Sequence, residues 1–144
     1  RTLAYLAIFC LIASIMVYGL FTRSDMDINV LRDRNPLFTQ LSDGDIRNGF
    51  TFKILNKAHT TRTFALSVQG LKGLELKVIG AEKNLSGDTP LTTVKPDKLK
   101  SLRLLVTAPK GVMKSSSADI KFAIKELKTG EQAFYDSIFR GPEK

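Results

Sequence analysis

The side chains that could bind a metal ion or start a nucleophilic reaction are few in this sequence and far apart. It contains one histidine, His59, one cysteine, Cys10, and three methionines, Met16, Met26 and Met113. A zinc or copper site needs several nitrogen or sulfur ligands that converge on one ion. A nucleophile needs a base beside it, and Cys10 lies in an apolar run while His59 lies in a polar segment. We therefore predict no catalytic, metal or cofactor site and no small-molecule substrate for this sequence.

Basic residues are the second feature with possible chemistry. The formal net charge is +8, and Asp97 is the only acidic residue between positions 95 and 114. The basic residues of that stretch are Lys95, Lys98, Lys100, Arg103, Lys110 and Lys114. Such a candidate interaction patch could contact anionic lipid headgroups or an acidic partner, or it could be the solvated surface of loops. Nucleic acid is not an expected partner, because no aromatic residues are interleaved for base stacking.

An uncharged segment near the N-terminus predicts a transmembrane helix. Residues 3–21 carry no charge, and Ser14 is their only conventional polar side chain. A helix of this length covers about 28 Å, close to the hydrocarbon thickness of a bilayer. Tyr5 and Tyr18 lie near its ends, where aromatic rings favour the membrane interface. A cleaved signal peptide would have a shorter apolar core and a small-residue cleavage site. Because the sequence begins with Arg1 instead of methionine, we expect more protein upstream.

Apolar and polar residues alternate through most of the remaining sequence. Phe50, Phe52 and Ile54 share one strand face, for example, and Thr51 and Lys53 share the other. This period of two indicates antiparallel sheets with one buried face. About seven or eight such segments, separated by turn residues, indicate a sandwich or barrel. The expected core residues are Phe50, Phe52, Ile54, Phe64, Leu66, Val68, Leu102, Leu104, Val106, Ile120, Phe122 and Ile124.

The fold class that we predict is all-β: an immunoglobulin-like antiparallel β-sandwich preceded by one transmembrane α-helix. The sequence has no tryptophan and no cysteine pair, so the sandwich is not of the antibody type. The predicted organisation is a transmembrane helix over residues 1–22, a linker with a first short strand over 23–45, and the sandwich over 46–144.

Two segments of the sequence resemble a known family. Residues 28–38 read INVLRDRNPLF, and residues 44–57 read GDIRNGFTFKILNK. The first is similar to the segment after the last membrane helix, and the second to the first long strand of the C-terminal domain, of the cytochrome c oxidase accessory proteins of the FixG/CcoG/RdxA type. The resemblance extends over essentially the whole sequence, as the final helix plus the terminal domain.

This resemblance implies a place for the domain in a larger redox protein. Full-length members resemble membrane-bound polyferredoxins, whose cysteine motifs upstream would hold [4Fe–4S] clusters. The family is associated with assembly of the cbb3-type cytochrome oxidase through copper reduction. The implied partners are the membrane and oxidase subunits or copper-handling assembly factors. No cluster-binding cysteine falls in this sequence, so no functional residue of the family transfers to it.

We therefore expect a membrane-tethered, non-catalytic accessory domain in the bacterial inner membrane. One alternative is a copper carrier in its own right, and another is a generic surface binding module. Two features of the sequence disagree about the side of the membrane on which the domain lies. Arg23, Arg32 and Arg34 follow the apolar run while Arg1 alone precedes it, which favours a cytoplasmic domain by the positive-inside rule. The resemblance implies a periplasmic domain, and we follow the resemblance.

Overall fold

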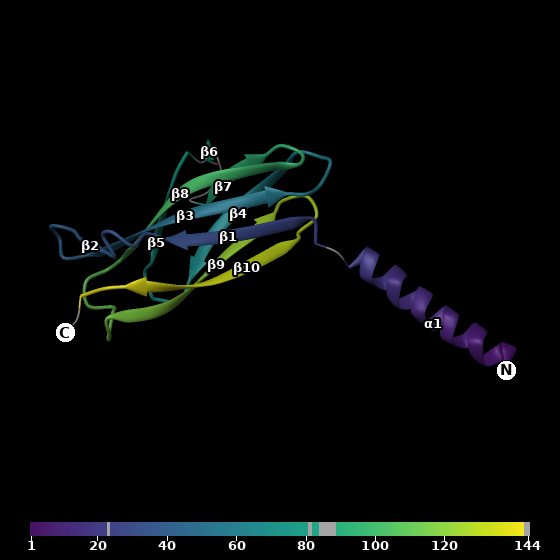
Figure 1. Cartoon of the computed structure of the whole chain (residues 1–144). Coiled ribbons are helices and arrows are strands. Elements are labelled where there is room, and N and C mark those ends of the chain that lie inside the picture. The colour runs from purple at the N-terminus through teal and green to yellow at the C-terminus, as the bar shows by residue number, and fades with distance from the viewer. Residues whose placement is uncertain (23, 81, 84–88, 143–144) are drawn as a thin grey trace.

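The apolar N-terminal segment forms one helix that stands apart from the rest of the chain. In the computed structural model, which describes residues 1–22, 24–80, 82–83 and 89–142, this helix is α1 (Thr2–Phe21) (Figure 1). No residue of α1 is buried, and nearly all of its side chains are apolar. A helix satisfies its own backbone hydrogen bonds and is therefore suited to an apolar solvent. By length and composition α1 could cross a membrane.

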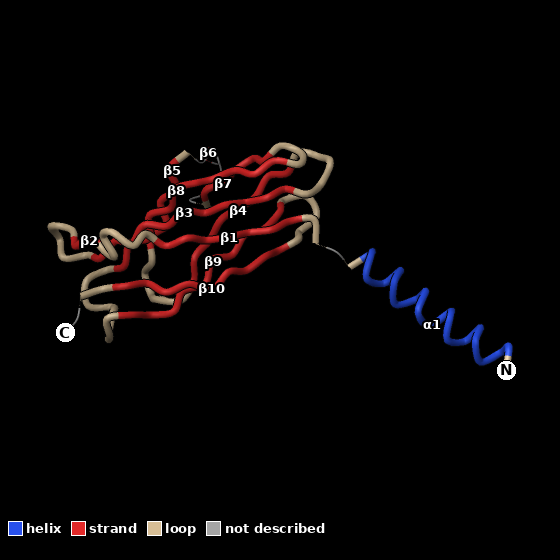
Figure 2. The backbone as a smooth tube through the Cα atoms, viewed as in Figure 1, coloured by secondary structure: helices blue, strands red, loops and turns tan. Residues whose placement is uncertain are grey.

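Strands make up most of the described chain after α1 (Figure 2). They are β1 (Met26–Arg32), β2 (Thr39–Gln40), β3 (Ile46–Asn56), β4 (Arg62–Gln69), β5 (Glu75–Ile79), β6 (Glu82–Lys83), β7 (Pro90–Val94), β8 (Lys98–Ala108), β9 (Ser117–Glu126) and β10 (Gln132–Arg140). Two of them, β2 and β6, have only two residues and lie outside the segments that alternation predicts.

The strands form two antiparallel sheets that pack face to face. One sheet has the order β1-β3-β8-β5, with β2 also paired to β3, and the other has the order β10-β9-β4-β7-β6. All of these pairs are antiparallel. The predicted fold class, an immunoglobulin-like sandwich preceded by one apolar helix, is confirmed.

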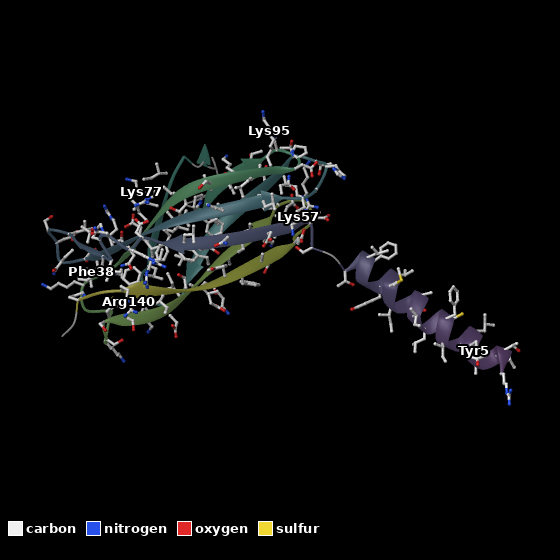
Figure 3. All side chains as sticks on the ribbon, in the orientation of Figure 1. Tyr5, Phe38, Lys57, Lys77, Lys95 and Arg140 are labelled. Carbon is white, nitrogen blue, oxygen red and sulfur yellow. The ribbon has the colours of Figure 1, made fainter. Side chains whose placement is uncertain are left out.

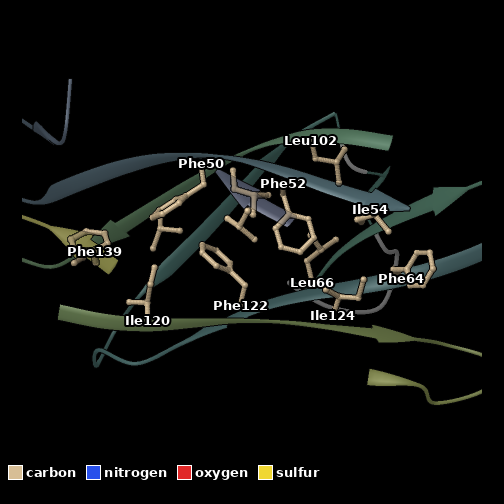
Figure 4. Close-up of a cluster of buried hydrophobic side chains, with 14 of the residues drawn as sticks. Phe50, Phe52, Ile54, Phe64, Leu66, Leu102, Ile120, Phe122, Ile124 and Phe139 are labelled. Atoms are coloured by element: carbon tan, nitrogen blue, oxygen red, sulfur yellow. The ribbon is translucent and has the colours of Figure 1, made fainter. Parts of the chain in front are cut away.

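The core lies between the sheets, where the predicted strand faces meet. Burial alternates residue by residue along the whole of β3, as side chains on a pleated strand require. The ring of Phe122 packs edge-on against Phe50 and Phe52, with centroid separations of 5.0 and 5.9 Å (Figure 4). Of the twelve expected core residues, all are buried except Val68, which is partly buried and packs against the others. The predicted assignment of buried strand faces is therefore confirmed.

The sandwich starts earlier in the chain than residue 46. β1 lies inside the range 23–45 that we expected to be a linker with a short strand, and it pairs with β3 from Met26 to Arg32. Met26 and Val30 are buried in the common core. The physical reason is that β3 would otherwise be an exposed sheet edge, which β1 covers. Only a few residues therefore separate α1 from the first strand.

Candidate functional site

The residues that could bind a metal lie apart in the structure. His59 lies in the loop between β3 and β4, where its side chain is 92% exposed and Nδ1 is 3.1 Å from the Asp97 carboxylate. Cys10 is exposed on α1, and Met26 and Met113 are buried in the core. Among the described residues, no three histidine, cysteine, aspartate or glutamate side chains come together as a potential metal site.

The basic residues of the candidate interaction patch lie at both ends of β8. Lys95 and Lys98 precede or begin this strand, and Lys110 and Lys114 lie beyond its last residue. An antiparallel strand rises about 3.4 Å per residue, so the two pairs are about 30 Å apart or more. Figure 3 shows Lys95 at the end of the sandwich nearest α1, which we call the helix-proximal end. The backbone N–H of Lys110 donates to Asp45 at the opposite, distal end.

The two remaining patch residues make contacts within the domain. The side chain of Lys100 is on the inward phase of β8, and its Nζ donates to the Thr93 carbonyl at 3.0 Å. The guanidinium of Arg103 forms a two-point ion pair with the Asp33 carboxylate on the outer face of the sheet. These six residues are therefore not one continuous surface, and partner binding by any of them stays a prediction.

The Arg103–Asp33 ion pair lies directly over Gly49 of β3. A side chain at Gly49 would bring its Cβ into collision with the Asp33 carboxylate and place it 3.1 Å from the Arg103 guanidinium. The backbone N–H of Asp33 also donates to the Gly49 carbonyl at 3.0 Å. Asp33 and Gly49 belong to the two sequence segments that carry the family resemblance. At these positions the segments serve packing, with β1 continuing into a turn that closes over β3.

Asn48 is a structural residue that sequence analysis missed. It is fully buried on the inward face of β3, and its amide exchanges two hydrogen bonds with the backbone of Arg140 in β10. A signal was available, because a polar residue in the apolar phase between Ile46 and Phe50 requires a buried partner. The same signal applies to Glu126, which follows Phe122 and Ile124 in the inward phase of β9.

A network of charged groups, which we call the junction, joins the segment after α1 to the sandwich. Arg62, whose side chain is 12% exposed, donates to Glu131 at 2.9 Å and to Asp25 at 3.3 Å. Ser24 donates to the other carboxylate oxygen of Glu131 at 2.8 Å. The backbone N–H of Lys57 donates to the Asp25 carbonyl at 2.8 Å. No local pattern could have predicted this network, because its members come from four separate parts of the sequence.

Glu126 lies next to the junction and has a perturbed acidity. Burial alone would raise the pKa of Glu126, but hydrogen bonds from Thr129 and from the backbone of Lys128, with the charge of Arg62, together lower it. One carboxylate oxygen, Oε2, accepts from both the backbone N–H and the hydroxyl of Thr129. The carboxylate therefore shapes the turn between β9 and β10 and stays ionised there.

Comparison with known proteins gives one consistent family. Residues 16–142 match the family described as "IG-like fold at C-terminal of FixG, putative oxidoreductase". The chain is 32% identical to the nitrogen fixation protein FixG of Rhizobium meliloti, over 99% of this chain and 27% of FixG. It is also 32% identical to protein RdxB of Cereibacter sphaeroides, over 98% of this chain and 29% of RdxB. The chain thus spans less than a third of the length of these curated relatives.

A solved structure shares the fold of the domain. The crystal structure of a FixG-related protein from Vibrio parahaemolyticus superposes with a TM-score of 0.68 and 21% sequence identity. The alignment covers 82% of this chain and 97% of the other. This likeness supports the sandwich topology that the strand pairing gives.

Proposed function

Because this chain belongs to the family of immunoglobulin-like folds at the C-terminus of FixG, we propose that it is the last membrane helix and terminal domain of a protein that supports assembly of cbb3-type cytochrome c oxidase. The observation that carries the proposal is the family match over residues 16–142, which takes in the end of the apolar helix and the whole described sandwich. The curated relatives, FixG and RdxB, are more than three times as long as this chain.

In this proposal the domain does no redox chemistry itself. The electron-transfer groups, [4Fe–4S] clusters, belong to the part of the protein upstream of this chain, and copper reduction takes place there. Two observations support this division of roles. Among the described residues, no three potential metal ligands come together. Asp33 and Gly49, which lie in the two segments that resemble the family, pack against each other. The domain then acts as a positioned binding module on the periplasmic side of the bacterial inner membrane.

Removal of the domain from the full-length protein tests the proposed role. Deletion of residues 24–144 should lower the amount of assembled cbb3-type oxidase in the membrane, while the electron paramagnetic resonance signals of the upstream clusters persist. A loss of those signals would instead show that the domain supports the clusters. Normal oxidase levels after the deletion would refute the proposed function.

Side of the membrane and partner contacts need separate measurements. An alkaline phosphatase fused after residue 144 should be active, since that enzyme matures only in the periplasm. An inactive fusion present at a normal level would refute the orientation.

Charge reversal at Lys110 and Lys114 tests whether the distal end binds oxidase subunits or copper-handling assembly factors. Lost co-purification of such a protein would support binding there, and unchanged co-purification would discard that end as the binding surface. The matched control reverses Lys121 and Lys125 on β9.

A further inference from the structure

We propose that the helix-proximal end of the sandwich is a docking surface for anionic lipid headgroups, which holds the domain against the membrane instead of leaving it on a free tether. This inference rests on the proposed membrane anchoring of α1. It follows from the length of the connection, the charges at this end and the apolar side chains among them.

The connection between α1 and the sandwich is too short to let the domain move away. α1 ends at Phe21, and Ser24 is already hydrogen-bonded to Glu131 of the sandwich. An extended residue spans at most about 3.5 Å, so this connection reaches about 10 Å. Asp25 is held twice more, through its ion pair with Arg62 and its bond from the backbone of Lys57. The end of the sandwich that carries the junction is therefore attached within about 10 Å of the end of α1.

Three loops form the helix-proximal end: the loop between β3 and β4, the loop between β7 and β8, and the turn between β9 and β10. The side chain of Asn56 holds the first two together. The strand register places Met26 beside Asn56 and Asn56 beside Lys98. The buried amide of Asn56 donates to the carbonyls of Thr60, Val94 and Lys95 at 2.8, 3.2 and 3.2 Å. The third loop, the turn between β9 and β10, joins the junction through Glu131. Figure 3 shows Lys57 and Lys95 at this end, whereas Phe38 and Arg140 lie at the distal end.

At this end three lysines make no ion pair with any described residue, whereas the carboxylates around them do. Lys95, Lys98 and Lys128 are exposed, and none of them makes an ion pair within the part of the chain that the structure describes. The acidic side chains nearby are all engaged. The ion pairs there are Asp25 and Glu131 with Arg62, Asp97 with His59, and Asp27 with Lys57. The exposed Lys95, Lys98 and Lys128 therefore carry charge at this end that no carboxylate of the described chain contacts. Lysines near an anionic bilayer surface are attracted to it.

Two leucines accompany these lysines. Leu127 begins the turn after β9 and is 51% exposed, and Leu99, the second residue of β8, is 58% exposed. A single exposed leucine needs no explanation. Apolar side chains set among lysines, however, match the boundary between headgroups and acyl chains, where lysine stems lie along apolar surface with the charge in water. An acidic soluble protein is a poorer occupant, because the short connection leaves it no room between this end and the membrane.

Spin-label accessibility in lipid nanodiscs tests the docking. The full chain with Cys10→Ser carries a nitroxide at Thr61→Cys, in an exposed helix-proximal loop, or at Ser42→Cys, in an exposed distal loop. It is reconstituted in phosphatidylcholine alone or with added phosphatidylglycerol. We expect a water-soluble nickel complex to collide about twofold less often with the Thr61 label when phosphatidylglycerol is present. The Ser42 label should not change, and about 1 M salt should cancel the effect.

Two matched triple variants show whether the lysines carry the effect. Lys95→Gln, Lys98→Gln and Lys128→Gln should remove the difference between the two lipid compositions. Lys72→Gln, Lys110→Gln and Lys114→Gln, which remove the same charge from the distal half, should retain it. A chain that inserts into both nanodiscs but shows equal Thr61 accessibility in them refutes the docking alone. A chain that leaves the nanodiscs at high salt refutes the anchoring by α1, and with it both proposals.

Discussion

Asn48 and Arg140, which lie 92 residues apart in the chain, exchange two hydrogen bonds across the sandwich. The Asn48 amide nitrogen donates to the Arg140 carbonyl at 2.7 Å, and the Arg140 backbone N–H donates to the Asn48 side-chain oxygen at 2.9 Å. Asn48 belongs to β3 and Arg140 to β10, so this pair connects the two sheets near the distal end. It satisfies the backbone at the end of β10, where no further strand can do so.

Loss of this amide should destabilise the fold without affecting α1. Asn48→Ala leaves a backbone donor and a backbone acceptor of Arg140 without their partner, and each such group costs about 1–3 kcal/mol when buried. We expect a clearly lower free energy of unfolding, measured by denaturant titration of the full chain in detergent micelles. The control is Gln40→Ala, an exposed position of β2, which should change little. Equal stability of the two variants would contradict the role given to Asn48.

Gly49 should tolerate no side chain beneath the Arg103–Asp33 ion pair. In Gly49→Ala the added Cβ would meet the Asp33 carboxylate, so that carboxylate has to move and its ion pair with Arg103 is disturbed. We expect destabilisation and altered backbone amide chemical shifts near Asp33. Gly111→Ala is an uninformative comparison because Gly111 has φ near +84°, so the control is Thr51→Ala, also on β3. The double variant Gly49→Ala, Asp33→Ala should recover part of the loss, since the clash is gone.

The phenylalanines between the sheets should dominate stability. Phe122 contacts Phe50 and Phe52 edge-on, and truncation of a buried phenylalanine to alanine costs about 3–5 kcal/mol. Phe52→Ala and Phe122→Ala should both lower the melting temperature sharply. Phe134→Ala is the matched control, because Phe134 is exposed on β10, and it should melt close to the unaltered chain.

The lowered pKa of Glu126 makes a signed prediction about acid stability. Its ordinary pKa is 4.5 and the folded value is lower, so the folded state binds this proton less readily than the unfolded state does. The stabilisation is therefore complete above the ordinary pKa and declines as the pH falls through the folded value. Melting temperatures measured from neutral pH down to acid should fall less in Glu126→Gln than in the unaltered chain.

The stability of Glu126→Gln at neutral pH and a control variant complete this test of the Glu126 carboxylate. At neutral pH the Gln variant should be the less stable protein, since the charged interactions with Thr129 and Arg62 are weakened. Asp136→Asn is the control, because Asp136 is 83% exposed in its side chain. Parallel pH curves for Glu126→Gln and the unaltered chain would contradict the role of this carboxylate.

The chain should bind no copper or zinc with high affinity. His59 is an exposed loop residue whose nearest charged neighbour is Asp97, and a stable site needs several converging ligands. Calorimetric titration of the full chain with Cu(I), Cu(II) and Zn(II) should give no stoichiometric binding at micromolar concentrations. A stoichiometric site that persists in Cys10→Ser and in His59→Ala would overturn this prediction and revive a copper-carrier function.

The sequence by itself determined which side of each strand is buried and which segment could enter a membrane. Those properties are local, because side chains alternate along a strand and an uncharged run of about 20 residues is sufficient to span a bilayer. Phe52, Leu104 and Phe122 were assigned to the core in this way, and each is at most 1% exposed. The two family segments also indicated the family to which the domain belongs.

Only the tertiary structure decided what lies near what. Lys98 and Lys110 are close in the sequence but lie at opposite ends of the sandwich, because the extended strand β8 separates them. Conversely Arg62, Asp25 and Glu131 are far apart in the sequence and meet at the junction. Strand pairing between distant segments sets these distances, and a repeat of two residues carries no information about which strands pair. For the same reason β1, which alternation alone marked as a short strand in a linker, is part of the core.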